Sequence, residues 1–164
     1  EGDGALWLAE QGCGTTATDI SQNALDHVAA EAVRRGLDVT CLQADAVVAG
    51  ALGDEPYDLV SLQYGSFHRS PDRTGVRNLL GAVAPGGTLL VVAHDLAPMR
   101  EPVDVAEQTR MFDPDAYVGV EEIAAAVKDD DAWEVEVLET RPRPPGAASS
   151  HHVDDVVLRA RRLA

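Results

Sequence analysis

Apolar and polar positions along the chain follow two periods, one typical of helices and the other typical of strands. The clearest helix covers residues 21–36, where apolar side chains recur every three to four positions. Ser21 suits its N-cap, and Gly36 suits the position just after its last turn. The same period predicts three other helices, at residues 5–11, 72–84 and 120–128.

Short runs rich in β-branched and other apolar residues lie between these helices and predict strands. The first three strands are expected at residues 14–20, 38–45 and 57–64. Residues 88–94 read TLLVVAH, a continuous apolar run that is typical of a strand with both faces buried. The APGG sequence just before it, residues 84–87, is predicted to be the turn that ends the preceding helix.

The last third of the chain is organised differently. Residues 133–140 alternate between apolar and polar side chains, which predicts a half-exposed strand, and residues 151–162 predict another strand. The proline-rich residues 141–150 between them predict a loop. Because no helix separates the two strands, they can pair antiparallel. An irregular segment is expected at residues 95–119.

The alternation of strands and helices predicts an α/β fold. We expect a Rossmann-like, doubly wound, mostly parallel sheet with an antiparallel C-terminal strand, formed by residues 1–164 as a single domain. Ligands of such sheets bind at the carboxyl ends of the strands, near the topological switch point. The segments that follow the strands are therefore the candidates for function.

Composition narrows the range of partners. The formal net charge of the 164 residues is −15, which repels phosphate backbones and anionic membranes. We therefore expect a small-molecule substrate, with neither nucleic acid nor a membrane as partner. No apolar run approaches the ~18 residues of a membrane span, and a cytoplasmic location is expected. Lys128 is the only lysine, which together with abundant alanine, aspartate and valine favours a bacterial source with a GC-rich genome.

Two features invite a metal site, and neither supports one. Cys13 and Cys41 have no metal-binding spacing and are interpreted as reduced thiols. His151 and His152 stand next to each other, followed by a pair of aspartates. Adjacent side chains of a strand point to opposite faces, so the two histidines would chelate one ion poorly. We predict no bound metal.

The first strand-end segments carry glycines and carboxylates. The chain opens EGDG, where Gly2 and Gly4 would let the backbone approach a ligand closely before a helix begins. Asp19 ends the next strand, about 20 residues on, where a carboxylate can bind both ribose hydroxyls of an adenosine cofactor. The alternative is that Asp19 merely precedes the helix cap. Asp45 could accept the adenine amino group, or it could only cap the next turn.

In their order and spacing, these segments resemble the class I S-adenosylmethionine-dependent methyltransferase family. The resemblance covers essentially the whole chain, and its best likeness is to small bacterial enzymes similar to the tellurite-resistance and thiopurine methyltransferases. It rests on EGDGALWLAE, TATDIS, LQADA, YDLVSLQY, LLGAVAPGGTLLVVAHD, WEVEVLET and VDDVVLRARR.

The resemblance implies a cofactor, S-adenosyl-L-methionine, and a role for each matching position. Gly2 matches the last glycine of the loop that passes the methionine part of the cofactor. Asp19 matches the ribose binder, and Ile20 would pack on the adenine. The other matches are the adenine-reading pair Asp45 and Ala46, and Gln63 and Tyr64, which would line both cofactor and substrate.

The chain departs from the family at its beginning. The family starts with an apolar strand that lies centrally, between the strands at 14–20 and 57–64, whereas here Glu1 already falls inside the glycine loop. Without that strand, each orphaned backbone group costs about 1–3 kcal/mol, against a domain stability of only about 5–15 kcal/mol. We expect the sequence to be an N-terminally truncated fragment, with activity that depends on the absent strand.

The resemblance implies in-line displacement at the methyl group, in which proximity and alignment supply much of the acceleration. A base is needed only if the acceptor must lose a proton. The candidates are Tyr64, His68 and His94, and each can equally be a packing or loop-capping residue. His94 is preferred because it directly follows a buried strand.

Two other functions remain open at this point. An NAD(P)-dependent Rossmann oxidoreductase would also use Asp19, although the terminal antiparallel pair and the APGG turn argue against it. A non-catalytic fragment is the third hypothesis, and the absent strand is its main support.

Overall fold

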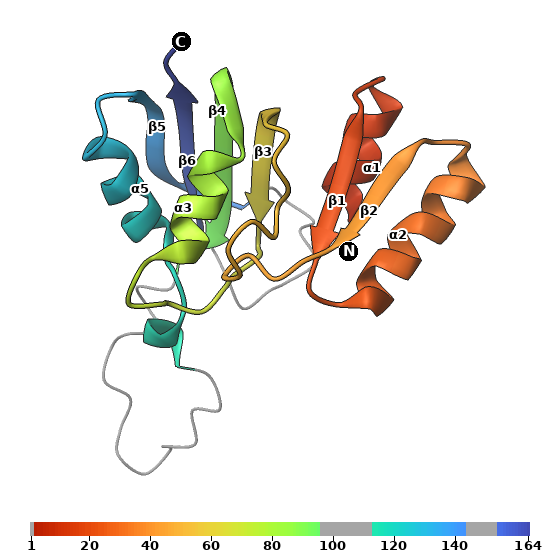
Figure 1. The fold of residues 1–164 in the computed structure, drawn as a ribbon, viewed down its shortest axis with the longest axis horizontal. Coiled ribbons are helices and arrows are strands. Elements are labelled where there is room, and N and C mark those ends of the chain that lie inside the picture. The colour runs from red at the N-terminus through yellow and green to blue at the C-terminus, as the bar shows by residue number, and fades with distance from the viewer. Residues whose placement is uncertain (1, 96–112, 144–153) are drawn as a thin grey trace.

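The computed structural model describes residues 2–95, 113–143 and 154–164. Helices and strands alternate, as the hydrophobic pattern predicts (Figure 1). The helices are α1 (Asp3–Glu10), α2 (Gln22–Arg35), α3 (Thr74–Gly81), the short 3-10 helix η2 (Pro114–Ala116) and α5 (Val120–Lys128). The strands are β1 (Thr15–Asp19), β2 (Val39–Gln43), β3 (Tyr57–Gln63), β4 (Val83–His94), β5 (Trp133–Pro142) and β6 (Asp154–Arg162).

The strands form two sheets. β1 and β2 pair in parallel as a two-stranded sheet. The second sheet has the order β3-β4-β6-β5, in which β3 and β4 are parallel and β6 runs antiparallel to both of its neighbours. The predicted α/β fold, with mostly parallel strands and an antiparallel C-terminal strand, is confirmed.

The division into two sheets falls where the sequence analysis places the absent strand. β1 and β3 face each other across the space between the sheets in Figure 1. Within the part of the chain that the structure describes, β1 pairs only with β2 and β3 pairs only with β4. Among the described residues, each of these two strands therefore keeps one edge without a ladder partner.

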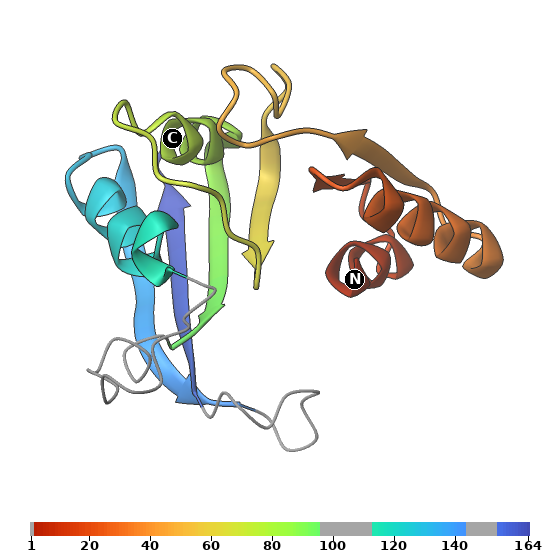
Figure 2. The same cartoon turned by 90° about the horizontal axis from the view of Figure 1, so that it is seen from below.

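Each sheet has its own hydrophobic core. α3 and α5 cover one face of the four-stranded sheet (Figure 2), and their apolar side chains pack on β4 and β6. Within this core, the side chains of Ile123, Leu89 and Leu158 are at most 1% exposed. α1 and α2 pack on β1 and β2 around Leu6 and Leu25. The two sheets are thus packed around separate hydrophobic cores.

Local signals place α2 and α5 correctly. The Ser21 hydroxyl accepts a hydrogen bond from the backbone N–H of Ala24 at 3.4 Å, and Gly36 takes the left-handed conformation after the last turn, with φ of 69°. α5 spans the predicted residues 120–128. The first helix begins two residues earlier than predicted, at Asp3.

The predicted turn at residues 84–87 is wrong. These residues lie inside β4, and α3 stops at Gly81 instead of reaching residue 84. Between β3 and β4 the register shifts irregularly, so the extra residues of β4 form a bulge. Gly86 has φ of +78° there, which glycine adopts without strain, while pairing continues on both sides. The residues typical of a turn thus occur within a strand.

Some predictions fall outside the described residues. The middle of the irregular segment, at 96–112, and residues 144–153 belong to this group. The latter include most of the predicted proline-rich loop and the two adjacent histidines.

Candidate active site

The first turn of α1 brings Gly2 and Gly4 against two different elements. Gly2 has φ of +77°, and a Cβ atom added to it would lie 2.2 Å from Cγ2 of Val28 on α2. A Cβ atom on Gly4 would lie 3.5 Å from Nε2 of Gln63, the last residue of β3. Gln63 in turn donates a hydrogen bond to the Ser61 hydroxyl at 2.9 Å. The start of α1 therefore meets the carboxyl end of β3.

Asp19 is the exposed last residue of β1. Its carboxylate accepts a hydrogen bond from the backbone N–H of Ser21 at 2.7 Å, so the capping interaction considered in the sequence analysis is present. Its backbone carbonyl accepts from the N–H of Ala44 at 3.0 Å, which joins the ends of β1 and β2. Ile20, beside it, is 65% exposed.

Asp45 and Ala46 lie in the segment after β2, which α3 holds in place. Oδ1 of Asp45 accepts a hydrogen bond from the N–H of Val47 at 3.0 Å, so this carboxylate also caps a turn. Asn78 of α3 donates to the carbonyls of Ala46 and Val48, both at 2.7 Å. The segment is thereby fixed to the four-stranded half of the molecule.

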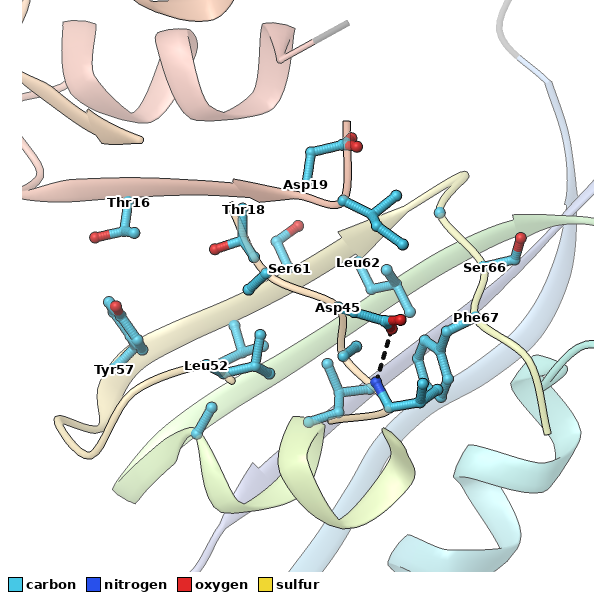
Figure 3. A pocket seen from close by; sticks show the side chains of 18 of the residues that line it. Thr16, Thr18, Asp19, Asp45, Leu52, Tyr57, Ser61, Leu62, Ser66 and Phe67 are labelled. Atoms are coloured by element: carbon cyan, nitrogen blue, oxygen red, sulfur yellow. Dashed lines mark hydrogen bonds between the residues drawn. The ribbon is translucent and has the colours of Figure 1, made fainter. Parts of the chain in front are cut away.

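A cavity of about 490 Å³ brings several predicted residues together (Figure 3). It lies between β1 and β3, and the segments after β1, β2 and β3 close it. Five of the predicted site residues line it: Asp19, Ile20, Asp45, Ala46 and His68. Leu62 and Phe67 belong to its apolar wall, and Figure 3 shows the Asp45 side chain beside that of Phe67. Gly2, Gly4, Gln63, Tyr64 and His94 do not line this cavity.

His68 is fixed by an aromatic partner. Its ring stacks on Tyr117 with a centroid distance of 4.4 Å, and the two residues also form an isolated backbone bridge. Both line the cavity.

Tyr64 and His94 meet at a second place, on Asp155. The Tyr64 hydroxyl donates to Oδ2 of Asp155 at 2.7 Å, and Nδ1 of His94 lies 3.1 Å from Oδ1. The two aromatic rings are 4.7 Å apart between centroids. Tyr64 adopts a left-handed φ of 54°, uncommon for a residue other than glycine, at the turn directly after β3.

Arg143 completes this group. Its Nε lies 3.4 Å from Oδ2 of Asp155, and its guanidinium carbon is 5.4 Å from the centroid of the Tyr64 ring. Asp155 is 5% exposed. Loss of solvation at this group raises the pKa of the Tyr64 hydroxyl, and the hydrogen bond to the Asp155 carboxylate raises it further. We call Tyr64, His94, Arg143 and Asp155 the Asp155 cluster.

Tyr64 and His94 were predicted from the sequence as site residues, whereas Asp155 and Arg143 were not. Asp155 was considered only as part of a metal site, and no residue pattern linked it to His94, 61 positions earlier. The available signal was the predicted antiparallel C-terminal strand, but neither its pairing with β4 nor its register could be read from the chain.

No helix in residues 2–95, 113–143 and 154–164 is long and apolar enough to cross a membrane. In the same ranges, no group of three or more histidine, cysteine, aspartate or glutamate side chains is placed to hold a metal ion.

The fold is shared with solved structures. An enzyme that converts a disulfide bond into a thioacetal group during echinomycin biosynthesis matches with a TM-score of 0.68 and 21% identity, over 99% of this chain and 71% of that one. The N-methyltransferase NodS from Bradyrhizobium japonicum matches with a TM-score of 0.62 and 17% identity, over 91% of this chain and 73% of that one. TehB from Haemophilus influenzae matches with a TM-score of 0.66 and 16% identity, over 98% of this chain and 53% of that one.

At these identities the structural matches concern the fold, and the family follows from the sequence model. Comparison with curated proteins finds no match. The model of the methyltransferase domain family matches residues 1–87, more than half of the 164 residues. The chain therefore belongs to the methyltransferase domain family, and the class I S-adenosylmethionine-dependent type predicted from its sequence is confirmed.

Proposed function

We propose that the chain binds S-adenosylmethionine at the carboxyl ends of β1, β2 and β3 and methylates a small-molecule acceptor by in-line displacement. The observation that carries the proposal is the convergence of Asp19, Ile20, Asp45 and Ala46 on one cavity in a member of this family. Two separate segments of the chain, those at the ends of β1 and β2, contribute to that convergence.

The residues present fit an adenosine group. Asp19 offers a carboxylate to ribose hydroxyls, and exposed Ile20 offers an apolar surface to a purine ring. Asp45 accepts hydrogen bonds, and Asn78 holds the Ala46 backbone in place beside it. Gly2, Gly4 and Gln63 would lie along the methionine part of the cofactor, since the start of α1 meets the end of β3 there.

When bound, the cofactor supplies an electrophilic methyl group on a positively charged sulfur. The tasks left to the chain are to align the acceptor, exclude water and accept a proton where the acceptor carries one. His94 and Tyr64 lie at the carboxyl ends of β4 and β3, where an acceptor would approach. His68 lies on the cavity wall and is the third candidate.

The charge of the chain supports a small-molecule acceptor. A net charge of −15 disfavours approach of a phosphate backbone. A neutral or cationic acceptor would not meet this repulsion.

The experiment that tests the proposal is calorimetric titration of the chain with S-adenosylmethionine and, separately, with NAD. Replacing Asp19 with Asn keeps an oxygen for the Ser21 N–H and removes the charge that would hold the ribose. Loss of a hydrogen bond to a charged group costs about 1.5–3 kcal/mol, so we expect affinity for S-adenosylmethionine to fall about 10- to 100-fold.

Asp38→Asn is the matched control, because Asp38 is exposed beside β2 and does not line the cavity. It should bind like the unchanged chain. Preferential binding of NAD would overturn the proposal in favour of an oxidoreductase. So would binding of neither ligand by a chain that unfolds cooperatively, which would favour a non-catalytic fragment.

A further inference from the structure

The Asp155 cluster forms where four segments of the chain meet. His94 is the last residue of β4 and is the register partner of Asp155 on β6. Tyr64 follows β3 directly, and Arg143 follows β5. The cluster therefore stands at the carboxyl ends of β3, β4 and β5, the edge at which ligands of such sheets bind.

The contacts of the Asp155 carboxylate determine which nitrogen of His94 carries the proton and where the Tyr64 hydroxyl hydrogen points. An ionised carboxylate only accepts hydrogen bonds. Nδ1 of His94, 3.1 Å from Oδ1 of Asp155, must then carry the proton, and in the neutral ring Nε2 carries the basic lone pair. The Tyr64 hydroxyl donates to the other oxygen at 2.7 Å. One buried carboxylate thus orients two candidate catalytic side chains.

The burial of Asp155 shows what its partners have to provide. A carboxylate that is 5% exposed must be compensated by hydrogen bonds and an opposite charge. Tyr64 and His94 supply hydrogen bonds, and the Arg143 guanidinium, 3.4 Å away, supplies the charge. By contrast, the His94 side chain is 27% exposed. The carboxylate is thus buried behind an imidazole that reaches the surface.

We propose that Asp155 is a positioning residue: it holds His94 in the Nδ1–H tautomer, so that Nε2 accepts the proton of the methyl acceptor. The part of this inference that concerns the reaction rests on the proposed function, whereas the tautomer of His94 does not depend on it. An acceptor with an O–H, N–H or S–H bond gives that proton to Nε2. Its electron pair forms the new bond to the methyl carbon, and the electrons of the broken carbon–sulfur bond go to sulfur.

The imidazolium that results carries the acquired proton on Nε2 and keeps its original proton on Nδ1, against Asp155. The negative charge of the carboxylate stabilises this imidazolium until Nε2 releases the acquired proton to water. General base catalysis of this kind contributes roughly 10²–10⁴-fold to a rate.

The test is the tautomer of His94, measured by nitrogen-15 NMR of the whole chain at a pH where the ring is neutral. The resonances are assigned by comparison with His94→Gln. We expect the Nδ1–H form in the unchanged chain. In Asp155→Asn the side-chain amide can donate to Nδ1, and we expect the Nε2–H form to gain population. The Nε2–H form in the unchanged chain would overturn the proposal, and this outcome needs no variant to fold.

The kinetic test uses release of S-adenosylhomocysteine with catechol, thiophenol and aniline as probe acceptors. In Asp155→Asn we expect kcat to fall at least about 10²-fold, with the affinity for S-adenosylmethionine retained and Asp155→Glu restoring part of the rate. Asp154→Asn is the matched control on the neighbouring residue of β6 and should keep both rate and tautomer. Equal kcat in Asp155→Asn would overturn the positioning role.

Failure of the proposed function gives a different result. If S-adenosylmethionine does not bind but the unchanged chain shows the Nδ1–H tautomer that Asp155→Asn loses, the positioning by Asp155 stands and the methylation reaction does not.

Discussion

At the residue scale, Gly2 and Gly4 meet different requirements although they stand two positions apart. Both were predicted from the sequence to be places where the backbone approaches a cofactor. The structure adds a packing reason for Gly2, whose missing side chain makes room for Val28 while its φ is +77°. At Gly4 an added Cβ would only touch Gln63 at 3.5 Å.

Replacing Gly2 with Ala should therefore destabilise the chain. An alanine in the left-handed region costs about 1–2 kcal/mol, and the clash with Val28 adds an overpacking term of about 1–3 kcal/mol where α1 cannot shift. The measurement is urea unfolding followed by circular dichroism.

Gly14→Ala is the matched control. No atom lies within 4 Å of a Cβ added at Gly14, and its φ is not positive. Its unfolding midpoint should stay close to that of the unchanged chain. Equal stability of Gly2→Ala would show that the first turn of α1 does not pack against α2 in solution.

At the element scale, charged side chains at the end of α2 bind that helix to α1. Glu31 pairs with Arg34 and Arg35 at 2.5 Å each, and Arg35 also reaches Glu10 of α1 at 3.0 Å. The hydrogen bond from Arg34, then that from Arg35, lowers the pKa of Glu31 from 4.5 to about 2. Both arginines also lie at the helix C-terminus, where positive charge is favourable.

The lowered pKa predicts a pH dependence of stability. The contribution of Glu31 is present above its ordinary pKa of 4.5 and is lost as the pH falls toward its folded-state pKa of about 2. Glu31→Gln should lower the thermal unfolding midpoint at about pH 6, and the difference should shrink as the pH falls below 4.5. The effect should be small because the side chains are exposed.

Glu55→Gln serves as the comparison, since Glu55 is exposed in the segment before β3. The difference in thermal unfolding midpoint between Glu55→Gln and the unchanged chain should not vary with pH in the same way. A Glu31→Gln midpoint that differs equally at all pH values would argue against the ion pairs.

At the scale of the whole molecule, the main feature is that β1 and β3 each have one edge without a ladder partner among the described residues. The two strands point the same way in Figure 1, and β3 carries Leu59, which is 38% exposed, toward the cavity. Unpaired strand edges and exposed apolar side chains reduce stability and invite association with other chains.

An added parallel strand between β1 and β3 should therefore stabilise the molecule. We predict that an apolar strand of about six residues, fused before Glu1, raises the unfolding midpoint. It should also protect the backbone amides of β1 and β3 from hydrogen exchange, because both strands gain a partner.

The same fusion with a central proline is the control, since proline removes a backbone donor and interrupts a central strand. It should give neither effect. Unchanged amide exchange in the apolar fusion would show that the space between the two sheets does not accept a strand.

The sequence alone determined where the elements lie, because helices and strands depend on periodicity and caps within a few residues. Residues 21–36, with Ser21 and Gly36 at their ends, carry that information completely. The family could be predicted for a similar reason, since it rests on the order and spacing of such elements. The turn predicted at residues 84–87 failed because the pairing partner of a glycine bulge is not a local property.

Only the tertiary structure decided how the candidate site is divided. Asp19 and Asp45 reach the cavity because β1 pairs with β2, and they stand apart from Tyr64 and His94. Asp155 reaches His94 through the antiparallel register of β4 and β6. That register is set by side chains packing across strands more than 60 positions apart, and no pattern along the chain specifies it.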